Sequence, residues 1–263
     1  MRDWKVEHKT VIVDFINYLN FHSDKYILKG GTALMLCYGL DRFSVDIDID
    51  GQGSSIKGII DRFCANNGYS YRVAKDTDTV NRYMINYGDD SRPLKVEVSF
   101  RRKSIEANEY DNINGILVYK IDSLAIMKSN AYTSRDKIRD LFDLTFICNN
   151  YFDNLSPQTL TLLRSAIEYK GLEQLDYVLR EQDDELIDKD KLIESFLIMF
   201  EKLDLLYDKE EKELLKPREK FTKKGSFFAN AKTVNFSRLK PREKFTNEVT
   251  PPQHPAQDNS PKE

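Results

Sequence analysis

The residues best suited to chemistry lie between residues 26 and 51, where a pair of glycines is followed closely by alternating aspartates. The second part of this stretch, residues 44–50, reads Ser-Val-Asp-Ile-Asp-Ile-Asp. In a β-strand, side chains two residues apart point to the same side. We therefore expect Asp46, Asp48 and Asp50 to share one face of a strand, and the valine and the isoleucines to share the buried face.

Aligned carboxylates of this kind indicate a bound cation. Two like charges about 4 Å apart repel by about 4 kcal/mol at an effective dielectric near 20. Oxygen ligands suit Mg²⁺, which is usually shared with the phosphates of a substrate. Taken alone, the alternating aspartates are equally typical of a solvated strand face.

The glycine pair precedes the aspartates and forms the sequence Gly30-Gly31-Thr32. Backbone N–H groups freed by glycines, followed by the start of a helix, make a cradle for anionic oxygens. Alone, the sequence is more typical of a plain turn. A two-carboxylate metal site a dozen residues further on would supply the cation that bound phosphates need. Together the two features indicate nucleotidyl transfer.

The same stretch resembles the first motif of a known family. Gly30-Gly31-Thr32, followed by Arg42-Phe43-Ser44-Val45-Asp46-Ile47-Asp48, is similar to that of the AbiEii/AbiGii toxins. This family includes the MenT-like toxins and belongs to the DNA polymerase β superfamily of nucleotidyltransferases. The resemblance, which covers residues 25–147, implies that the two aspartates hold Mg²⁺. It further implies that the glycine turn and Ser44 grip the triphosphate of an NTP while Arg42 offsets its charge.

A second part of the chain, residues 124–144, resembles the distal motif of the family, in which a lysine is followed by an Arg-Asp-x-x-Asp helix. The resemblance implies that Lys128 reaches the nucleotide phosphates and that Asp143 supports the site by holding Lys128. Asp140 is a weaker candidate. Arg139 could equally lie on a solvated helix face, because an (i, i+4) ion pair with Asp143 contributes only a few tenths of a kcal/mol.

A third carboxylate is available on another strand, in which Lys95, Glu97 and Ser99 alternate with apolar residues. A solvated edge strand would show the same alternation. Beside Asp46 and Asp48, however, Glu97 could complete a metal site. Superfamily members most often carry aspartate at this position, so the glutamate departs from the usual pattern.

The remaining pattern predicts an α+β fold: a nucleotidyltransferase core with a mixed β-sheet flanked by helices, then a helical bundle. Helices are expected over residues 4–21, 156–169, 172–180 and 188–207, strands over 26–28, 44–50, 69–74 and 115–119, and a hairpin formed by 80–87 and 94–100. Helix N-caps are expected at Ser54-Ser55 and Asp136, and Gly68 is expected to end the helix that starts at Ser54-Ser55. The domains are then 1–120 (metal and nucleotide site), 121–214 (helical) and 215–263 (a basic, disordered tail).

Composition limits the class of protein. The 263 residues are 40% apolar and 32% charged, which is typical of a globular protein with ample material for a core. No run approaches the roughly 20 apolar residues of a membrane span, and the N-terminus lacks the apolar core of a signal peptide. Three isolated cysteines without a CxxC pattern favour a reducing cytoplasm. The three histidines form no sequence cluster, which argues against zinc or a histidine general base.

Charge is unevenly distributed along the chain. Residues 216–246 carry a balance of +8, whereas residues 1–215 carry −9. The sequence LKPREKFT occurs at 215–222 and again, unchanged, at 239–246. The segment between the copies is basic with interleaved aromatics, which suits an arm that contacts RNA. A tail produced by local duplication explains the same pattern.

These observations favour a metal-dependent nucleotidyltransferase, and the resemblance implies a toxin of a toxin–antitoxin or phage-defence operon with an antitoxin encoded nearby. Some relatives modify the acceptor end of tRNA, so a tRNA acceptor is implied. Two alternatives stay open: a related transferase acting on a protein or small molecule, and a non-catalytic nucleotide-binding module. The charge distribution does not separate a tRNA acceptor from a protein acceptor, since the body is acidic and the late segment is basic.

Overall fold

The computed structural model describes residues 3–88 and 92–206. The expected tail from residue 215, with its repeated octapeptide, lies outside the described residues, and residues 1–214 form a compact unit of their own. Among the described helices, none is long and apolar enough to cross a membrane.

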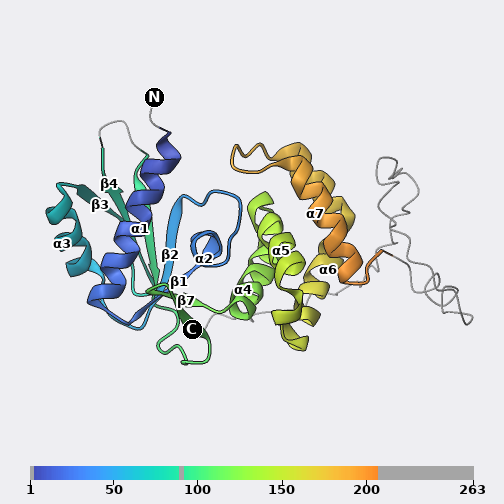
Figure 1. Ribbon diagram of the computed structural model, residues 1–263, viewed down its shortest axis with the longest axis horizontal. Helices are drawn as coiled ribbons and strands as arrows, with labels where there is room; N and C mark the ends of the chain where they lie inside the picture. Colours follow the sequence, from blue (N-terminus) through green and yellow to red (C-terminus); the bar gives the residue numbers. More distant parts are fainter. Residues whose placement is uncertain (1–2, 89–91, 207–263) are drawn as a thin grey trace, which may run out of the picture. The chain divides into compact units, whose positions relative to one another are not determined.

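A mixed sheet of seven strands occupies the first part of the described chain (Figure 1). Its spatial order is β3-β4-β5-β2-β1-β7-β6. The strands are β1 (Tyr26–Lys29), β2 (Asp46–Gly51), β3 (Ser70–Asp76), β4 (Val80–Asn86), β5 (Leu94–Ser99), β6 (Tyr110–Ile113) and β7 (Ile116–Tyr119).

The central strand β2 pairs antiparallel with β1 and parallel with β5. The expected hairpin is confirmed, since β4 and β5 pair antiparallel. Strand β6 is an edge strand that the sequence did not predict. Its centre, Asp111-Asn112, is polar and exposed, so it lacks the apolar alternation by which a half-buried strand is recognised.

Helices pack against the sheet, and all regular secondary structure of the described chain after residue 120 is helical (Figure 1). Among the described residues they are α1 (Trp4–His22), α2 (Gly30–Cys37), α3 (Lys57–Asn67), α4 (Ile121–Ser134), α5 (Ile138–Tyr151), the 3-10 turn η1 (Phe152–Asn154), α6 (Pro157–Glu181) and α7 (Lys189–Lys202). Helix α6 is interrupted at Gly171, whose φ of 66° breaks the helical geometry. The sequence had predicted two helices here, over 156–169 and 172–180.

Helix ends were predicted with mixed success. Gly68 ends α3 in the left-handed conformation, as expected. Asp188, where a helix was expected to begin, caps α7 through its side chain. The N-cap position of α3 is Ile56 rather than Ser54 or Ser55, although Ser55 Oγ accepts a hydrogen bond of 3.4 Å from the backbone N–H of Lys57. The cap at Asp136 was wrong, because α5 begins at Ile138 without a side-chain cap. The carboxylate of Asp136 instead pairs with Lys170 at 2.7 Å, so a partner from α6 takes the group that would have capped α5.

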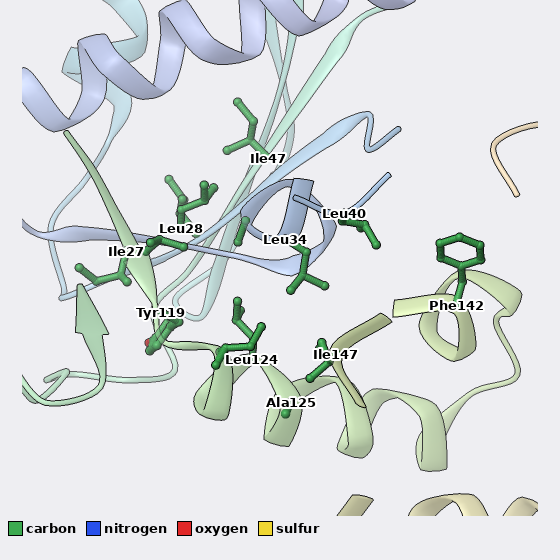
Figure 2. Packing of buried hydrophobic residues seen from close by; sticks show 14 of the residues in the cluster. Ile27, Leu28, Leu34, Leu40, Ile47, Tyr119, Leu124, Ala125, Phe142 and Ile147 are labelled. Atoms are coloured by element: carbon green, nitrogen blue, oxygen red, sulfur yellow. The ribbon is translucent and has the colours of Figure 1, made fainter. Parts of the chain in front are cut away.

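One apolar core joins the sheet to the helices that follow it. Alternation along β2 places Ile47 and Ile49 on the face covered by α1 and α3, while α2 packs on the opposite face over β1, β2 and β7. Figure 2 shows Leu34 of α2 lying between the labelled strand residues and the labelled residues of α4 and α5. Helix α2 therefore holds the strand that carries the aspartates against the C-terminal helices.

The α+β fold with a mixed sheet and flanking helices is confirmed. The last strand ends at Tyr119 and α4 begins at Ile121. The boundary between domains at residue 120 stays a prediction, because residues on both sides of it belong to one compact unit.

The buried face of β2 should be essential to stability. Ile47 is fully buried, so Ile47→Ala leaves a cavity and should lower the free energy of unfolding by about 2–5 kcal/mol. The matched deletion Ile126→Ala, at a side chain that is 37% exposed, should cost less than about 1 kcal/mol. Urea unfolding followed by circular dichroism measures both; equal losses would contradict this account of the core.

Candidate active site

The three aspartates lie on one face of β2, as their alternation predicts. The parallel neighbour β5 places Lys95 beside Asp46 and Glu97 beside Asp48. The structure therefore brings Asp46, Asp48 and Glu97 to adjacent positions on the same face of two hydrogen-bonded strands.

The glycine turn lies directly against this face. Gly30 has φ of 77°, and a Cβ atom built on it would lie 2.9 Å from Oδ2 of Asp48. A Cβ atom on Gly31 would lie 2.7 Å from Nη2 of Arg42 and 2.9 Å from Oγ of Ser44. A side chain at Gly30 would be strained by the positive φ and would crowd Asp48, and one at Gly31 would require Arg42 and Ser44 to move.

Two buried hydroxyls fix the turn to the aspartate strand. The Thr32 hydroxyl lies 3.0 Å from Oγ of Ser44 and donates to the backbone oxygen of Asp46. Both side chains are less than a tenth exposed. The hydroxyls therefore position the first turn of α2 relative to Asp46.

A buried cluster of charges connects this region to the C-terminal helices. Arg42 donates two hydrogen bonds to Asp143, from Nε at 2.6 Å and from Nη2 at 2.7 Å. Nζ of Lys128 lies 2.6 Å from Oδ2 of the same carboxylate. The contact of Lys128 with Asp143 that the resemblance implied is present, and Arg42, expected to face phosphate, is mainly engaged by Asp143.

Asp140 and Arg135 extend this cluster. Asp140 is 1% exposed and contacts Arg135 at 2.6 Å and Lys128 at 3.3 Å. Arg139 turns away and pairs at 2.5 Å with Asp184, in the segment before α7. From the sequence, Asp140 was only a weaker candidate and Arg135 was not identified. Arg135 precedes α5, the helix whose residue spacing was used to select candidates.

The environment of the Asp48 carboxylate differs from that of its neighbours. Burial raises the pKa of Asp48, and the carboxylates of Asp46 and Glu97 raise it further against the opposing charges of Lys95 and Lys128. Among the described residues, no cation lies within ion-pair distance of Asp48, whereas Asp46 pairs with Lys95 at 2.6 Å. Burial is thus the largest cause of the raised pKa, and Asp48 lacks the ion-pair partner that Asp46 has among the described residues.

The fit to a divalent cation rests on Asp46 and Asp48. Within residues 3–88 and 92–206, no three carboxylate, imidazole or thiolate side chains are gathered closely enough to hold a metal ion. Glu97 instead pairs with Arg82 at 2.6 Å. Two carboxylates on one strand face, one of them without an ion-pair partner among the described residues, suit Mg²⁺ shared with substrate phosphates. Asp46 and Asp48 as ligands are compatible with this geometry, and Glu97 as a third ligand stays a prediction.

Asp50, the third aspartate of the face, has a structural environment. It is 2% exposed, its Oδ1 pairs with Lys29, and its Oδ2 accepts a hydrogen bond of 2.9 Å from the Tyr119 hydroxyl. Its charge is therefore matched within the fold, in contrast to that of Asp48.

His8 is a positioning residue that the sequence did not reveal. Its Nε2 lies 2.8 Å from the backbone oxygen of Val45, and its Nδ1 lies 2.6 Å from the Tyr87 hydroxyl. Because a carbonyl only accepts, Nε2–H donates to Val45 and Nδ1 accepts from Tyr87. Burial lowers the pKa of His8, which favours this neutral form. The side chain anchors the residue immediately before the aspartate strand.

A cleft of about 610 Å³ lies behind Arg42, lined by α1 residues Lys5 and Lys9 and by the segments 40–43 and 185–188. Asp46 and Asp48 do not line it. The aspartates thus lie on a sheet face rather than in this cleft.

Paired aspartates beside a glycine turn, with a lysine brought in from a later helix, suit an enzyme that handles nucleoside triphosphates. The family model described as "Nucleotidyl transferase AbiEii toxin, Type IV TA system" matches residues 15–221, more than half of the chain. The chain belongs to this family and is a nucleotidyltransferase toxin. The interpretation as an enzyme is thereby confirmed, and membership implies an NTP substrate and an antitoxin partner.

The chain is also similar to several solved structures. JHP933 from Helicobacter pylori is 26% identical with a TM-score of 0.66, and covers 81% of this chain and 97% of its own. A putative nucleotidyltransferase from H. pylori is 25% identical with a TM-score of 0.65, covering 81% and 99%. MenT4, a nucleotidyltransferase toxin of Mycobacterium tuberculosis H37Rv, is 16% identical with a TM-score of 0.49, covering 77% and 85%. No curated protein matches the sequence.

The buried carboxylate of Asp143 should dominate the acid dependence of this region. Burial alone would raise its pKa, but the ion pairs with Lys128 and Arg42 hold the pKa below its ordinary value. Asp143→Asn leaves Arg42 buried without its anion and should lower the free energy of unfolding at pH 7 by about 3–5 kcal/mol.

The sign of the pH effect follows from the lowered pKa. Asp143 stabilises the fold fully above its unfolded pKa of about 3.9, and this stabilisation is lost as pH falls through the folded pKa. The difference between wild type and Asp143→Asn should therefore narrow below about pH 4. Denaturant unfolding at several pH values measures it, with Asp176→Asn, at an exposed ion pair, as a control costing less than about 1 kcal/mol. A difference that is constant with pH would contradict the assignment.

Proposed function

We propose that this nucleotidyltransferase is metal-dependent and transfers a nucleotide from an NTP to the 3′ end of tRNA, as the toxin of a toxin–antitoxin or phage-defence system. The observation that carries the proposal is the contact of the Gly30 turn with Asp48 on the strand that also bears Asp46. It is further supported by the family to which the chain belongs.

In the proposed reaction an acceptor hydroxyl attacks the α-phosphorus of the NTP. A new oxygen–phosphorus bond forms, the bond from the α-phosphorus to the bridging oxygen breaks, and pyrophosphate leaves. A carboxylate of the group Asp46, Asp48 and Glu97 accepts the hydroxyl proton. Mg²⁺ held by Asp46 and Asp48 would stabilise the charge that develops on the entering and leaving oxygens.

The remaining site residues would hold the triphosphate. Backbone N–H groups of Gly30 and Gly31, in the turn that lies against Asp48, could donate to phosphate oxygens. Lys128, with a side chain 12% exposed, would offset phosphate charge while Asp143 orients it. Thr32, Ser44 and Arg42 contact one another or the strand, and in this proposal they keep the turn in place around the nucleotide.

The cellular setting is part of the proposal. Cys37, Cys64 and Cys148 are free thiols, which suits a reducing cytoplasm, where tRNA and an antitoxin are also available.

The acceptor is identified by incubating the full chain with each radiolabelled NTP and either total tRNA or lysate protein. Label in tRNA, with pyrophosphate released in equal amount, is the expected result. Label in protein, or in a small-molecule fraction, would overturn the tRNA acceptor and establish the other transferase reaction.

Substitutions of Asp48 and Asp50, which lie on the same face of β2, should affect different properties of the protein. Asp48→Asn removes a carboxylate that repels its neighbours, so stability should be unchanged or higher, while pyrophosphate release should fall at least about 100-fold. Asp50→Asn removes the buried partner of Lys29 and should lower the free energy of unfolding by about 1–3 kcal/mol.

Thermal unfolding and a pyrophosphate assay measure these outcomes. Asp111→Asn, on the exposed strand β6, controls for loss of a carboxylate elsewhere and should leave both properties near wild type. Full activity of Asp48→Asn would show that the chemistry lies elsewhere.

A further inference from the structure

The face of the sheet that carries the aspartates continues beyond β5 with a row of positive charges. Registered positions run from Asp48 to Glu97 on β5, to Arg82 on β4 and to Lys75 on β3. The adjacent row contains Asp46, Lys95, Met84 and Arg72 in the same strand order. We call Arg72, Lys75, Arg82 and Lys95 the cationic strip.

The described helices leave this part of the face largely uncovered. Helix α3 packs on β3 from the opposite side, where Tyr71 donates a hydrogen bond to Asp61. Arg72 follows Tyr71 on the strand and therefore points to the other side. Helix α2 covers the aspartate face over β1, β2 and β7, but no described helix makes more than marginal contact with β3 or β4 on that side. Arg72 and Lys75 are exposed.

The strip is joined to the candidate active site through its inner members. Lys95 pairs with Asp46 at 2.6 Å and Arg82 pairs with Glu97 at 2.6 Å, whereas Arg72 and Lys75 make no ion pair with any described residue. With strands about 4.8 Å apart, three steps carry the strip about 14 Å from Asp48 to β3. A chain of phosphates leaving the site in this direction would pass the ion-paired Lys95 and Arg82 and then meet the exposed charges of Arg72 and Lys75.

The position of the strip relative to the groups proposed for the NTP indicates which substrate it faces. The Gly30 turn contacts Asp48 from β1, and Lys128 comes from α4, so the groups proposed for the NTP lie away from β3. The acceptor must reach the α-phosphorus from another direction. Described helices leave the β5-β4-β3 side largely uncovered; it begins at Glu97 and carries the exposed cations Arg72 and Lys75 on its outer strand.

We propose that the cationic strip binds the phosphate backbone of the acceptor RNA and delivers its 3′ hydroxyl to the aspartates. This inference rests on the proposed function for the identity of the substrate. Lysine and arginine side chains on a flat face contact phosphates without reading bases, so the strip contributes affinity and salt dependence rather than sequence preference. Any base selection would come from other residues.

Charged residues on an edge strand have a second explanation, since lysines there prevent sheets from pairing edge to edge. That role requires only charge on β3 and predicts no effect on RNA binding. It would be shown by self-association of a variant that still binds RNA normally.

The test compares two double variants of the full chain. Arg72→Gln/Lys75→Gln removes the outer half of the strip without touching the aspartates or their partners. Lys57→Gln/Arg62→Gln removes the same charge from exposed positions of α3, on the opposite side of the sheet. The basic segment 216–246 is present in both, so its contribution cancels.

Binding is measured by fluorescence anisotropy with a 5′-fluorescein-labelled single-stranded RNA of twelve nucleotides, from 50 to 200 mM salt. The strip variant should bind on the order of tenfold more weakly than wild type, with a salt slope shallower by about 1.4 for two lost phosphate contacts. The control variant should match wild type, and NTP binding should be unchanged in both. Equal RNA affinity for the two variants would overturn the proposal, and so would self-association of the strip variant with normal RNA affinity.

Transfer assays separate this inference from the proposed function. If RNA accepts label and the strip variant raises the KM for RNA without changing that for NTP, both stand. If no RNA accepts label but the strip variant alone loses RNA affinity, the proposed reaction fails and the RNA surface stands. If RNA accepts label and the strip variant keeps wild-type affinity and KM, the strip is not the RNA surface.

Discussion

The carboxylate of Asp143 is the interaction on which the arrangement of this molecule depends. A charge with no exposed surface is tolerated only when its partners are fully engaged, and here Arg42 and Lys128 are both within 2.7 Å. Arg42 belongs to the segment between α2 and β2, and Lys128 belongs to α4. One buried anion therefore sets the position of the C-terminal helices relative to the strand that bears Asp46 and Asp48.

The carboxylates near Asp143 differ in how fully cationic side chains of the fold neutralise them. Asp50 and Asp143 are matched inside the fold, and Asp46 and Glu97 are matched by single lysine and arginine side chains at partly exposed positions. Asp48 is the carboxylate of its face for which burial and like charges outweigh the neighbouring cations. Partly exposed partners can rearrange more easily than buried ones, which is a useful property where substrates and cations must enter.

Local chemistry was readable from the sequence, whereas long-range pairing was not. Alternation along residues 44–50 correctly placed the aspartates on one face, and the two glycines are at positions where a Cβ atom would collide with Asp48 or Arg42. Nothing in the sequence showed that Arg42 would be taken by Asp143, because that contact spans 101 residues and depends on how the core closes. His8 was missed for the same reason, since its partners Val45 and Tyr87 are distant in sequence. Helix caps failed where a competing side chain, such as Lys170 for Asp136, was supplied by another helix.

The separation of Arg42 and Asp143 along the sequence also determines when their contact can form during translation. During translation the glycine turn and the aspartate strand emerge well before α5, and a nascent chain that ends before Asp143 leaves Arg42 and Lys128 without the anion that orders them. Contacts this far apart in sequence form late, since closing a long loop costs entropy before the contact is gained. The chain must therefore be synthesised beyond Asp143 before the face that bears Asp46 and Asp48 is held in place against the C-terminal helices.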